Sequence, residues 1–328
     1  MIKKLSNKIN SKENQINITI VSGYLGAGKT TFLQHLINYE LFSSTVIIVN
    51  EFAKEGIDDI LLLGKVPVIK ISNGCICCTK KKHFFDLLHS FCNNKTDKQV
   101  NDDQIVKNII VETSGVSDPA SIYDGIITDL TLSRHILIEK IIVLFDAQSN
   151  LFSIENEPLI NNQIMSADEL IISKVDLVSN ERKNELFNFL RLLNKSAAIY
   201  SSIKGEKKLL LKNNKRTVAF KQRLSAEEKR QLGKIFSMKI KLRQNTNWNN
   251  LVIWLSALLH CHGEDIMRVK GIVMSPAGPI LLQGIKSHIQ KLQLLPKKYN
   301  SKPKYLLLIG RNIDKRKIVA AANFLRQN

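Results

Sequence analysis

Three of the chain's five cysteines lie within four positions, in the stretch Ser72-Asn73-Gly74-Cys75-Ile76-Cys77-Cys78-Thr79. On a turn that leaves a strand, Cys75, Cys77 and Cys78 can converge as thiolates on one soft cation, at about 2.3 Å. The C-x-C-C spacing differs from the C-x₂-C pairs of structural zinc fingers, and no second C-x-x-C pair completes a four-sulfur site. A site with three ligands and an open position suits a metal that must leave again.

Two other uses of these cysteines stay open. A catalytic cysteine needs only one thiol and an orienting histidine, whereas a redox sensor pairs two thiols. Three small buried hydrophobes would fit poorly on a turn that contains glycine. We rank a metal site first and a redox site second, and five cysteines in a chain of 328 residues argue against a disulfide framework.

A phosphate-binding motif precedes the cysteines. The segment Gly23-Tyr24-Leu25-Gly26-Ala27-Gly28-Lys29-Thr30 matches G-x-x-x-x-G-K-[ST], between an expected strand (17–22) and an expected helix. Glycines let such a loop wrap around phosphates, and its N–H groups point at the anion. We expect Lys29 to reach the β- and γ-phosphates and Thr30 to bind Mg²⁺. The predicted phosphate-binding residues are Gly23, Gly26, Ala27, Gly28, Lys29, Thr30 and Thr31.

A second motif predicts which base is bound. Ser173-Lys174-Val175-Asp176 fits the guanine-reading pattern [NTS]-K-x-D at the end of an expected strand (169–176). Asp176 can accept hydrogen bonds from guanine N1–H and N2–H₂, which adenine does not offer, and the Lys174 stem can pack on the ring. Ser202, at the end of the last expected strand (197–202), would offer its N–H to guanine O6. We therefore expect GTP rather than ATP.

Between these motifs lies Val111-Glu112-Thr113-Ser114-Gly115. An acid at the end of an apolar strand suits the Mg²⁺ shell or the positioning of a water molecule. The Gly115 N–H could bind the γ-phosphate, so that the loop responds to hydrolysis. Together with Lys29 and Thr30, Glu112 and Gly115 are the predicted catalytic residues.

The elements that must position these residues alternate between strand and helix. Further strands are expected over 45–50, 66–71, 108–113 and 140–146, and further helices over 81–92, from Asp118-Pro119 onward, and over 181–193. This order predicts an α/β fold, a P-loop NTPase with a mostly parallel, doubly wound sheet. We also expect the P-loop strand to neighbour the strand that precedes the cysteines.

The pattern changes after a charged connector. Strands are expected over 234–244, 269–275, 278–285 and 304–310, and helices over 248–260 and 316–327, which is typical of a smaller α+β domain. The predicted organisation is a basic tail (1–16), a GTPase domain (17–205), a connector (206–232) and a C-terminal domain (233–328).

Bulk composition limits the function classes. The formal net charge is +19, from 48 Lys+Arg against 29 Asp+Glu. The basic runs are short and separated and aromatic residues make up 6% of the chain, so we read the charge as solvated surface and do not expect a nucleic-acid partner. No signal peptide and no apolar run of about 18 residues is present, which favours a cytoplasmic protein without a membrane partner.

The P-loop, the C-x-C-C turn, E-T-S-G and S-K-x-D, in this order, resemble the CobW-type GTPases. The resemblance extends to Asn50-Glu51-Phe52 and to Arg268-Val269-Lys270-Gly271, and so covers nearly the whole chain. It implies a GTP-hydrolysing metallochaperone that delivers a transition metal, zinc foremost or another such as cobalt, to a client apoprotein. It also implies that Cys75, Cys77 and Cys78 are the metal ligands, with Glu51 as a possible further ligand. The chain would act as a monomer or a homodimer.

The chain departs from the family pattern N-E-F-G-E-V-G-I-D, because residues 50–58 read NEFAKEGID. Ala53 replaces a glycine, and Lys54 stands where the family often has an acid near the metal. The family's histidine-rich tracts are absent. His260-Cys261-His262 is the one compact His/Cys cluster elsewhere, and we interpret it as a helix end rather than a ligand set. The alternative function is a GTP-switched assembly factor for a cofactor-dependent enzyme, with structural cysteines.

Overall fold

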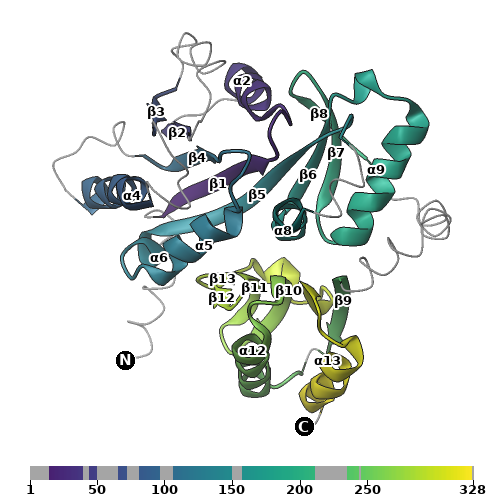
Figure 1. Ribbon diagram of the computed structural model, residues 1–328. Helices are drawn as coiled ribbons and strands as arrows, with labels where there is room; N and C mark the ends of the chain where they lie inside the picture. Colours follow the sequence, from purple (N-terminus) through teal and green to yellow (C-terminus); the bar gives the residue numbers. More distant parts are fainter. Residues whose placement is uncertain are drawn as a thin grey trace.

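A computed structural model describes residues 15–39, 44–49, 66–71, 81–96, 106–149, 157–210, 235–243 and 245–326 of the chain. They form two domains, each built on its own sheet (Figure 1). Among the described residues no helix is long and apolar enough to cross a membrane. The predicted fold, an α/β P-loop domain followed by a smaller α+β domain, is confirmed.

The described part of the first domain contains an eight-stranded sheet with the order β3-β2-β4-β1-β5-β6-β7-β8. Seven of these strands are parallel, and β8 runs antiparallel to β7. The strands are β1 (Ile16–Gly23), β2 (Thr45–Val49), β3 (Val68–Lys70), β4 (Asn108–Glu112), β5 (Ile136–Asp146), β6 (Glu169–Ser173), β7 (Ala198–Ile203) and β8 (Glu206–Leu209).

Helices cover both faces of this sheet. On one face α2 (Lys29–Tyr39) packs Phe32, Leu33, Leu36 and Ile37 against the strands. The other face carries α4 (Lys81–Thr96), α5 (Pro119–Thr128), α6 (Leu132–His135), α8 (Pro158–Ser166) and α9 (Asn180–Leu193). Adjacent strand residues serve opposite faces: Ile48 packs with the larger helix group and Ile47 with α2. Burial on both sides explains the continuously apolar strands.

Three expectations about this domain need correction. The P-loop strand β1 and the strand β3 before the cysteines are not neighbours, because β4 and β2 lie between them. Residues 206–209 were expected in the connector, but they form β8, since Lys204 and Gly205, both with positive φ, make a two-residue hairpin turn. Strand β5 begins at Ile136, before the expected residue 140.

The second domain is an antiparallel sheet with helices on one face. Its sheet order is β12-β11-β10-β14-β9, and β13 pairs with β11. The elements are β9 (Ile235–Leu242), α12 (Trp248–His262), β10 (Ile266–Ser275), β11 (Gly278–Ile285), β12 (His288–Ile289), β13 (Gln293–Leu294), η4 (Lys297–Tyr299), β14 (Lys304–Arg311), α13 (Lys315–Ala322) and η5 (Asn323–Arg326). Helices α12 and α13 bury their apolar faces on the sheet, around Trp254, Leu258 and Ile318.

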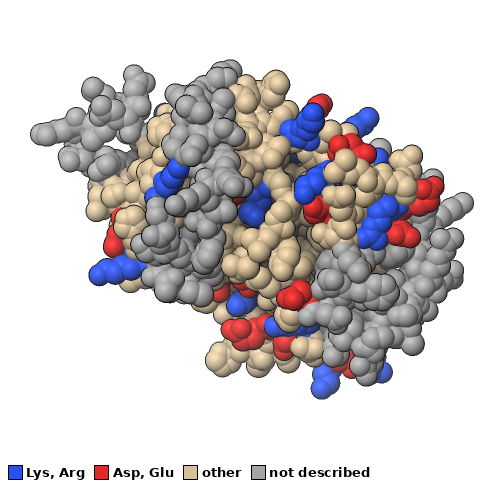
Figure 2. Space-filling view, turned by 45° about the horizontal axis from the view of Figure 1, so that its top comes forward, with Lys and Arg blue, Asp and Glu red and all other residues tan. Residues whose placement is uncertain are grey.

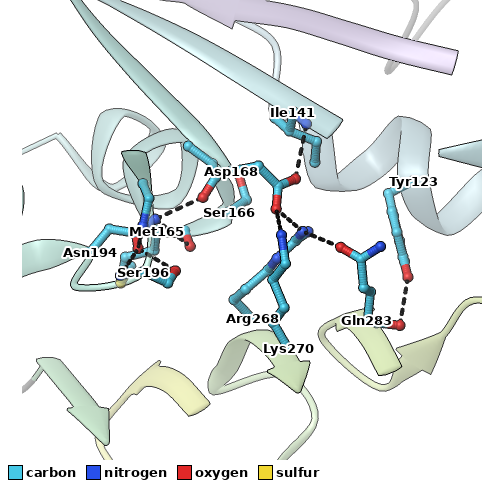
Figure 3. A network of polar contacts seen from close by, with 12 residues as sticks. Tyr123, Ile141, Met165, Ser166, Asp168, Asn194, Ser196, Arg268, Lys270 and Gln283 are labelled. Carbon is cyan, nitrogen blue, oxygen red and sulfur yellow. Dashed lines mark hydrogen bonds and ion pairs between the residues drawn. The ribbon is translucent and has the colours of Figure 1, made fainter. Parts of the chain in front are cut away.

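The opposite face of this sheet packs on the first domain, below α5 and α8 in Figure 1. Met165 at the end of α8 contacts Met267 and Ile309 in a small apolar cluster. Beside it, one carboxylate oxygen of Asp168 accepts from both Arg268 and Lys270 of β10 (Figure 3). Both cations belong to the segment Arg268-Val269-Lys270-Gly271. In this structure the segment binds the first domain.

Candidate nucleotide and metal site

The P-loop joins β1 to α2 at the carboxyl edge of the sheet. Gly23 has φ +138°, and a Cβ there would lie 2.3 Å from the Leu144 carbonyl oxygen, so the loop leaves the sheet where only glycine fits. Gly26 and Gly28 also have positive φ, at +74° and +82°. The motif glycines are thus required by the path of the loop.

The Lys29 ammonium lies within this loop. Its Nζ donates to the carbonyl oxygen of Gly23 at 2.9 Å and to that of Tyr24 at 3.2 Å. Because Lys29 opens α2, its charge stands at the helix N-terminus, where phosphates are bound.

Thr30 and Glu112 meet beside the loop. The Thr30 Oγ1 donates to the Glu112 Oε1 at 3.3 Å, although the two residues are 82 positions apart in the chain. Glu112 ends β4 and is 5% exposed. A hydroxyl and a carboxylate are the hard oxygen ligands that Mg²⁺ takes, so the two residues fit the predicted magnesium site.

The segment after Glu112 packs directly on the P-loop. A Cβ on Gly115 would lie 2.6 Å from the Leu25 backbone nitrogen, so no side chain fits between the two loops. Thr113 is fixed to β1, because its N–H donates to the Val21 carbonyl and its hydroxyl to Ser22 Oγ, both at 2.9 Å. The contact places Gly115 beside the P-loop, and its binding to the γ-phosphate stays a prediction.

Helix α8 holds the same loop from the other side, which sequence reasoning missed. The Gln163 amide, 1% exposed, donates to the Ser117 carbonyl at 2.8 Å and to the Gly115 carbonyl at 3.5 Å. A polar residue three positions after Ile160 and one before Ile164, on the buried face of a helix, was the available signal. The helix itself was not expected.

The base-reading motif is tied to the P-loop by a hydrogen bond. The Ser173 Oγ at the end of β6 donates to the Ala27 carbonyl at 2.8 Å and to the Phe145 carbonyl at 3.2 Å. Lys174 adopts φ +56°, and its ammonium lies 2.6 Å from the Asp146 carboxylate. Because Lys174 adopts the left-handed conformation, the chain leaves the strand there. The strand expected over 169–176 therefore ends at Ser173.

Asp176 lies in the short 3₁₀ helix η3 (Val175–Leu177), where it is exposed at the same edge of the sheet. Ser202 was expected at the end of the last strand, and it lies in β7 (Ala198–Ile203), where it pairs with Lys207 of β8. The hairpin tip packs on α2, because a Cβ on Gly205 would lie 2.8 Å from the Thr31 carbonyl oxygen. Ser202 is thus held near the P-loop helix. The N–H group that was predicted to contact guanine belongs to a residue of β7 that pairs with β8.

The predicted metal ligands Cys75, Cys77, Cys78 and Glu51 lie outside the described residues, as does the segment 50–58. The chain enters the cysteine segment from β3 and Ile71, whose N–H donates to the Val49 carbonyl at 3.0 Å. In the described ranges, no three His, Cys, Asp or Glu side chains gather as a metal site. His260, Cys261 and His262 are exposed at the end of α12, as the helix-end interpretation predicts.

Basic and acidic residues are interspersed on the face shown in Figure 2. This distribution agrees with the interpretation of the +19 charge as solvated surface.

The fold and the site together define a P-loop nucleotide-binding protein with an appended antiparallel-sheet domain. Residues 17–201 match the family described as CobW/HypB/UreG, nucleotide-binding domain, and residues 235–323 match the cobalamin synthesis protein cobW C-terminal domain. The chain belongs to the CobW/HypB/UreG family.

Relatives in this family are similar along most of the chain. The zinc chaperone YjiA of Escherichia coli is 27% identical over 287 residues, which are 83% of this chain and 87% of that protein. The zinc-regulated GTPase metalloprotein activator 1 of Schizosaccharomyces pombe is 26% identical over 198 residues, 58% of this chain and 46% of that protein. The crystal structure of Zn(II)-bound YjiA GTPase from E. coli has a TM-score of 0.63 at 19% identity, covers 96% of this chain and 100% of that one, and shows the shared fold.

Proposed function

We propose that this chain is a GTP-hydrolysing metallochaperone that binds a transition metal, zinc foremost, through Cys75, Cys77 and Cys78 and transfers it to a client metalloprotein. The observation that carries the proposal is the joining of three motifs at one sheet edge: Thr30 bonds to Glu112, and Ser173 bonds to the P-loop. The names of the relatives, zinc chaperone and zinc-regulated GTPase metalloprotein activator, support zinc as cargo.

The chain is a GTPase whose reaction is attack of water on the γ-phosphorus of GTP, which breaks the bond to the β–γ bridging oxygen and releases GDP and phosphate. In our proposal Lys29 neutralises the developing charge, Thr30 and Glu112 hold Mg²⁺, and Gly115 contacts the γ-phosphate. The proposed nucleotide contacts are Gly23, Gly26, Ala27, Gly28, Lys29, Thr30 and Thr31 for the phosphates, and Ser173, Lys174, Asp176 and Ser202 for guanine.

The sheet register gives a route from the nucleotide to the metal. Lys70, Val49, Glu112 and Val21 lie in one row across β3, β2, β4 and β1. Three strand spacings separate β3 from β1, roughly 14 Å at about 4.8 Å each. The corrected strand order excludes direct pairing of β3 with β1. In our proposal, coupling passes through the segments that follow Val49 and Glu112.

Linkage makes this coupling measurable. A metal that binds two nucleotide states unequally must shift nucleotide affinity by the same factor. Cys75, Cys77 and Cys78 need a compartment in which thiols stay reduced, so we place the protein in the cytoplasm. Glu51, on the segment that leaves β2, is the proposed further ligand, and the protein acts as a monomer or a homodimer.

The test is zinc affinity by chelator competition, with the protein reduced, in three states: without nucleotide, with Mg²⁺ and a non-hydrolysable GTP analogue, and with Mg²⁺ and GDP. We expect one tightly bound zinc, with affinities that differ between states by about tenfold, which is 1.4 kcal/mol of coupling. Cys77→Ala should lose tight zinc binding and keep GTP binding. Cys261→Ala is the matched control, because this exposed cysteine lies on α12 in the other domain.

The outcomes separate the parts of the proposal. Normal zinc affinity in Cys77→Ala would overturn the ligand assignment. Equal zinc affinity in all three states would overturn nucleotide gating and favour structural cysteines in an assembly factor. Lys29→Ala should weaken GTP binding and abolish the difference between states, while leaving the nucleotide-free zinc affinity unchanged.

A further inference from the structure

The outer edge of the C-terminal sheet offers backbone groups for pairing. Strand β9 pairs with β14 along its whole length, from Ile235↔Arg311 to Leu242↔Lys304, and no described strand pairs with its other edge. In an antiparallel pair, alternate residues direct both N–H and C=O at the partner strand, and the residues between them direct both away. Strand β9 therefore presents a row of outward donors and acceptors, which is a template for an added strand.

A groove of about 270 Å³ follows this edge. One wall is β9 and the chain just after it, and the other is formed by Val319 and Ala322 of α13 with Leu325 of η5. Val319 is 49% exposed, although it lies beside a helix face that is otherwise packed on the sheet. Met238, Ile240 and Leu242 are half-buried along the same wall. The groove thus has an apolar floor next to an edge of β9 with which no described strand pairs.

The alternate positions of β9 carry positive charge. Lys239, Lys241 and Arg243 are exposed and also line the groove, and no described acidic residue lines it. The Lys239 ammonium lies 4.0 Å from the centroid of the Tyr305 ring of β14, which places it on the sheet face away from the half-buried residues. An added strand would meet apolar surface with one set of side chains and cations with the other.

We propose that the groove between β9 and α13 binds an extended segment of a protein partner by strand addition, and that this segment alternates apolar residues with Asp or Glu. Apolar side chains would enter the groove beside Val319, and carboxylates would face Lys239, Lys241 and Arg243. The partner is the client metalloprotein, and this identification rests on the proposed function. The strand pairing itself requires neither zinc nor nucleotide. The chemistry favours a peptide over a nucleic acid, because a phosphodiester backbone makes no strand hydrogen bonds and no use of an apolar floor.

The probe is a fluorescein-labelled peptide of sequence VEVEIEVE, matched to the eight residues of β9, with binding to the full chain followed by fluorescence anisotropy. We expect saturable binding, weaker by about tenfold or more for VKVKIKVK. The same acidic peptide, N-methylated at alternate residues in each of the two registers, should lose binding in one register only, because only one set of its N–H groups faces β9.

Two variants locate the peptide. Lys241→Glu and Val319→Glu should each weaken binding by about tenfold. Ile253→Glu is the matched control, because Ile253 is 60% exposed on α12 of the same domain, outside the groove. All three variants should keep wild-type zinc and GTP binding, so failure of this inference is distinguishable from failure of the proposed function.

Four outcomes would overturn the inference. The first is absence of peptide binding to the full chain, which includes the case that residues 211–234 cover the edge. The second is equal binding of both N-methylated peptides, and the third is an equal effect of Val319→Glu and Ile253→Glu on peptide binding. The fourth is displacement of the peptide by a single-stranded RNA. Dimerisation that Lys241→Glu abolishes would replace the partner segment with a second copy of the chain.

Discussion

The contact of Asp168 with β10 should hold the two domains together. Its Oδ1 accepts from Arg268 Nη2 at 2.5 Å and from Lys270 Nζ at 2.8 Å, and its Oδ2 accepts from the Ile141 N–H at 3.0 Å (Figure 3). The Asp168 and Arg268 side chains are 8% and 3% exposed, whereas Lys270 is 35% exposed. Asp168→Asn therefore leaves a buried guanidinium without its counter-charge.

The expected loss follows from these exposures. Removing one partner of a buried ion pair costs about 3–5 kcal/mol, and the half-exposed Lys270 adds only about 0–1 kcal/mol because its ammonium can turn to water. Asp168→Asn should therefore lower the free energy of unfolding of the second domain by about 3–5 kcal/mol. Adding Arg268→Met removes the buried guanidinium that has lost its counter-charge, so the double variant should recover part of the lost free energy of unfolding.

The assay uses the position of the tryptophans. Trp248 and Trp254 are the two in the chain, and both lie on α12, so their fluorescence reports the second domain, while far-UV circular dichroism reports both domains. In urea the two signals should change together in the wild type. In Asp168→Asn the fluorescence transition should move to lower urea and separate from the dichroism transition.

The matched control is the adjacent carboxylate. Glu169 pairs with Lys140 at 3.2 Å and Lys207 at 3.1 Å, but both lysines are about a third exposed and belong to the first domain. Glu169→Gln should cost about 0–1 kcal/mol per pair and leave the transitions coincident. An equal cost for Asp168→Asn and Glu169→Gln, or coincident transitions in Asp168→Asn, would refute the reasoning.

The same contact predicts a pH dependence. Burial alone would raise the pKa of Asp168, but the charges of Arg268 and Lys270, with hydrogen bonds from Lys270 and the Ile141 N–H, outweigh it and lower the pKa below its ordinary value. A carboxyl with a depressed folded-state pKa stabilises the protein fully above its unfolded pKa of about 3.9, and this stability is lost as the pH falls through the folded value. The difference between the wild type and Asp168→Asn should therefore be constant above about pH 5 and shrink only below about pH 4.

Three further predictions concern buried positions. Gly115→Ala should displace the P-loop at Leu25 and weaken binding of a fluorescent GTP analogue by about tenfold or more, because a Cβ has no room there. Ser173→Ala should lower the free energy of unfolding by about 1–3 kcal/mol and weaken GTP binding, because the buried Ala27 carbonyl loses its donor. Asn194→Ala should cost about 3 kcal/mol or more in urea unfolding, because this fully buried amide satisfies carbonyls at the end of α8 and N–H groups before β7.

Controls keep these predictions specific. Asn184→Ala changes an exposed position on α9, where the side-chain amide donates to the Asn180 carbonyl, and should change stability by less than about 0.5 kcal/mol. Unchanged GTP affinity in Gly115→Ala would contradict the close packing of the two loops. A loss in Asn194→Ala no larger than that in Asn184→Ala would contradict its bridging role.

Much of the fold could be predicted from local pattern. Strands buried on both faces read as short, continuously apolar runs, and Asp118-Pro119 correctly predicted α5, whose Ala120 N–H donates to the Asp118 side chain. Helix α8 was missed because it has only nine residues and because the buried Gln163 interrupts its apolar pattern. Strand β8 was missed because only its pairing with β7 distinguishes a charged edge strand from a connector.

The sequence by itself determined which chemical groups are present and in what order: a phosphate loop, a thiol cluster, an acid at a strand end and a guanine-reading segment. These depend on residue type and short spacing, which a chain carries without its fold. Tertiary structure alone decided which groups meet. It placed Glu112 against Thr30, Ser173 against Ala27 and Asp168 between two cations of the second domain, and it separated β3 from β1 by two strands. Parallel pairing joins residues far apart in the chain, and its order is set by the packing of whole helices and strands rather than by any local pattern.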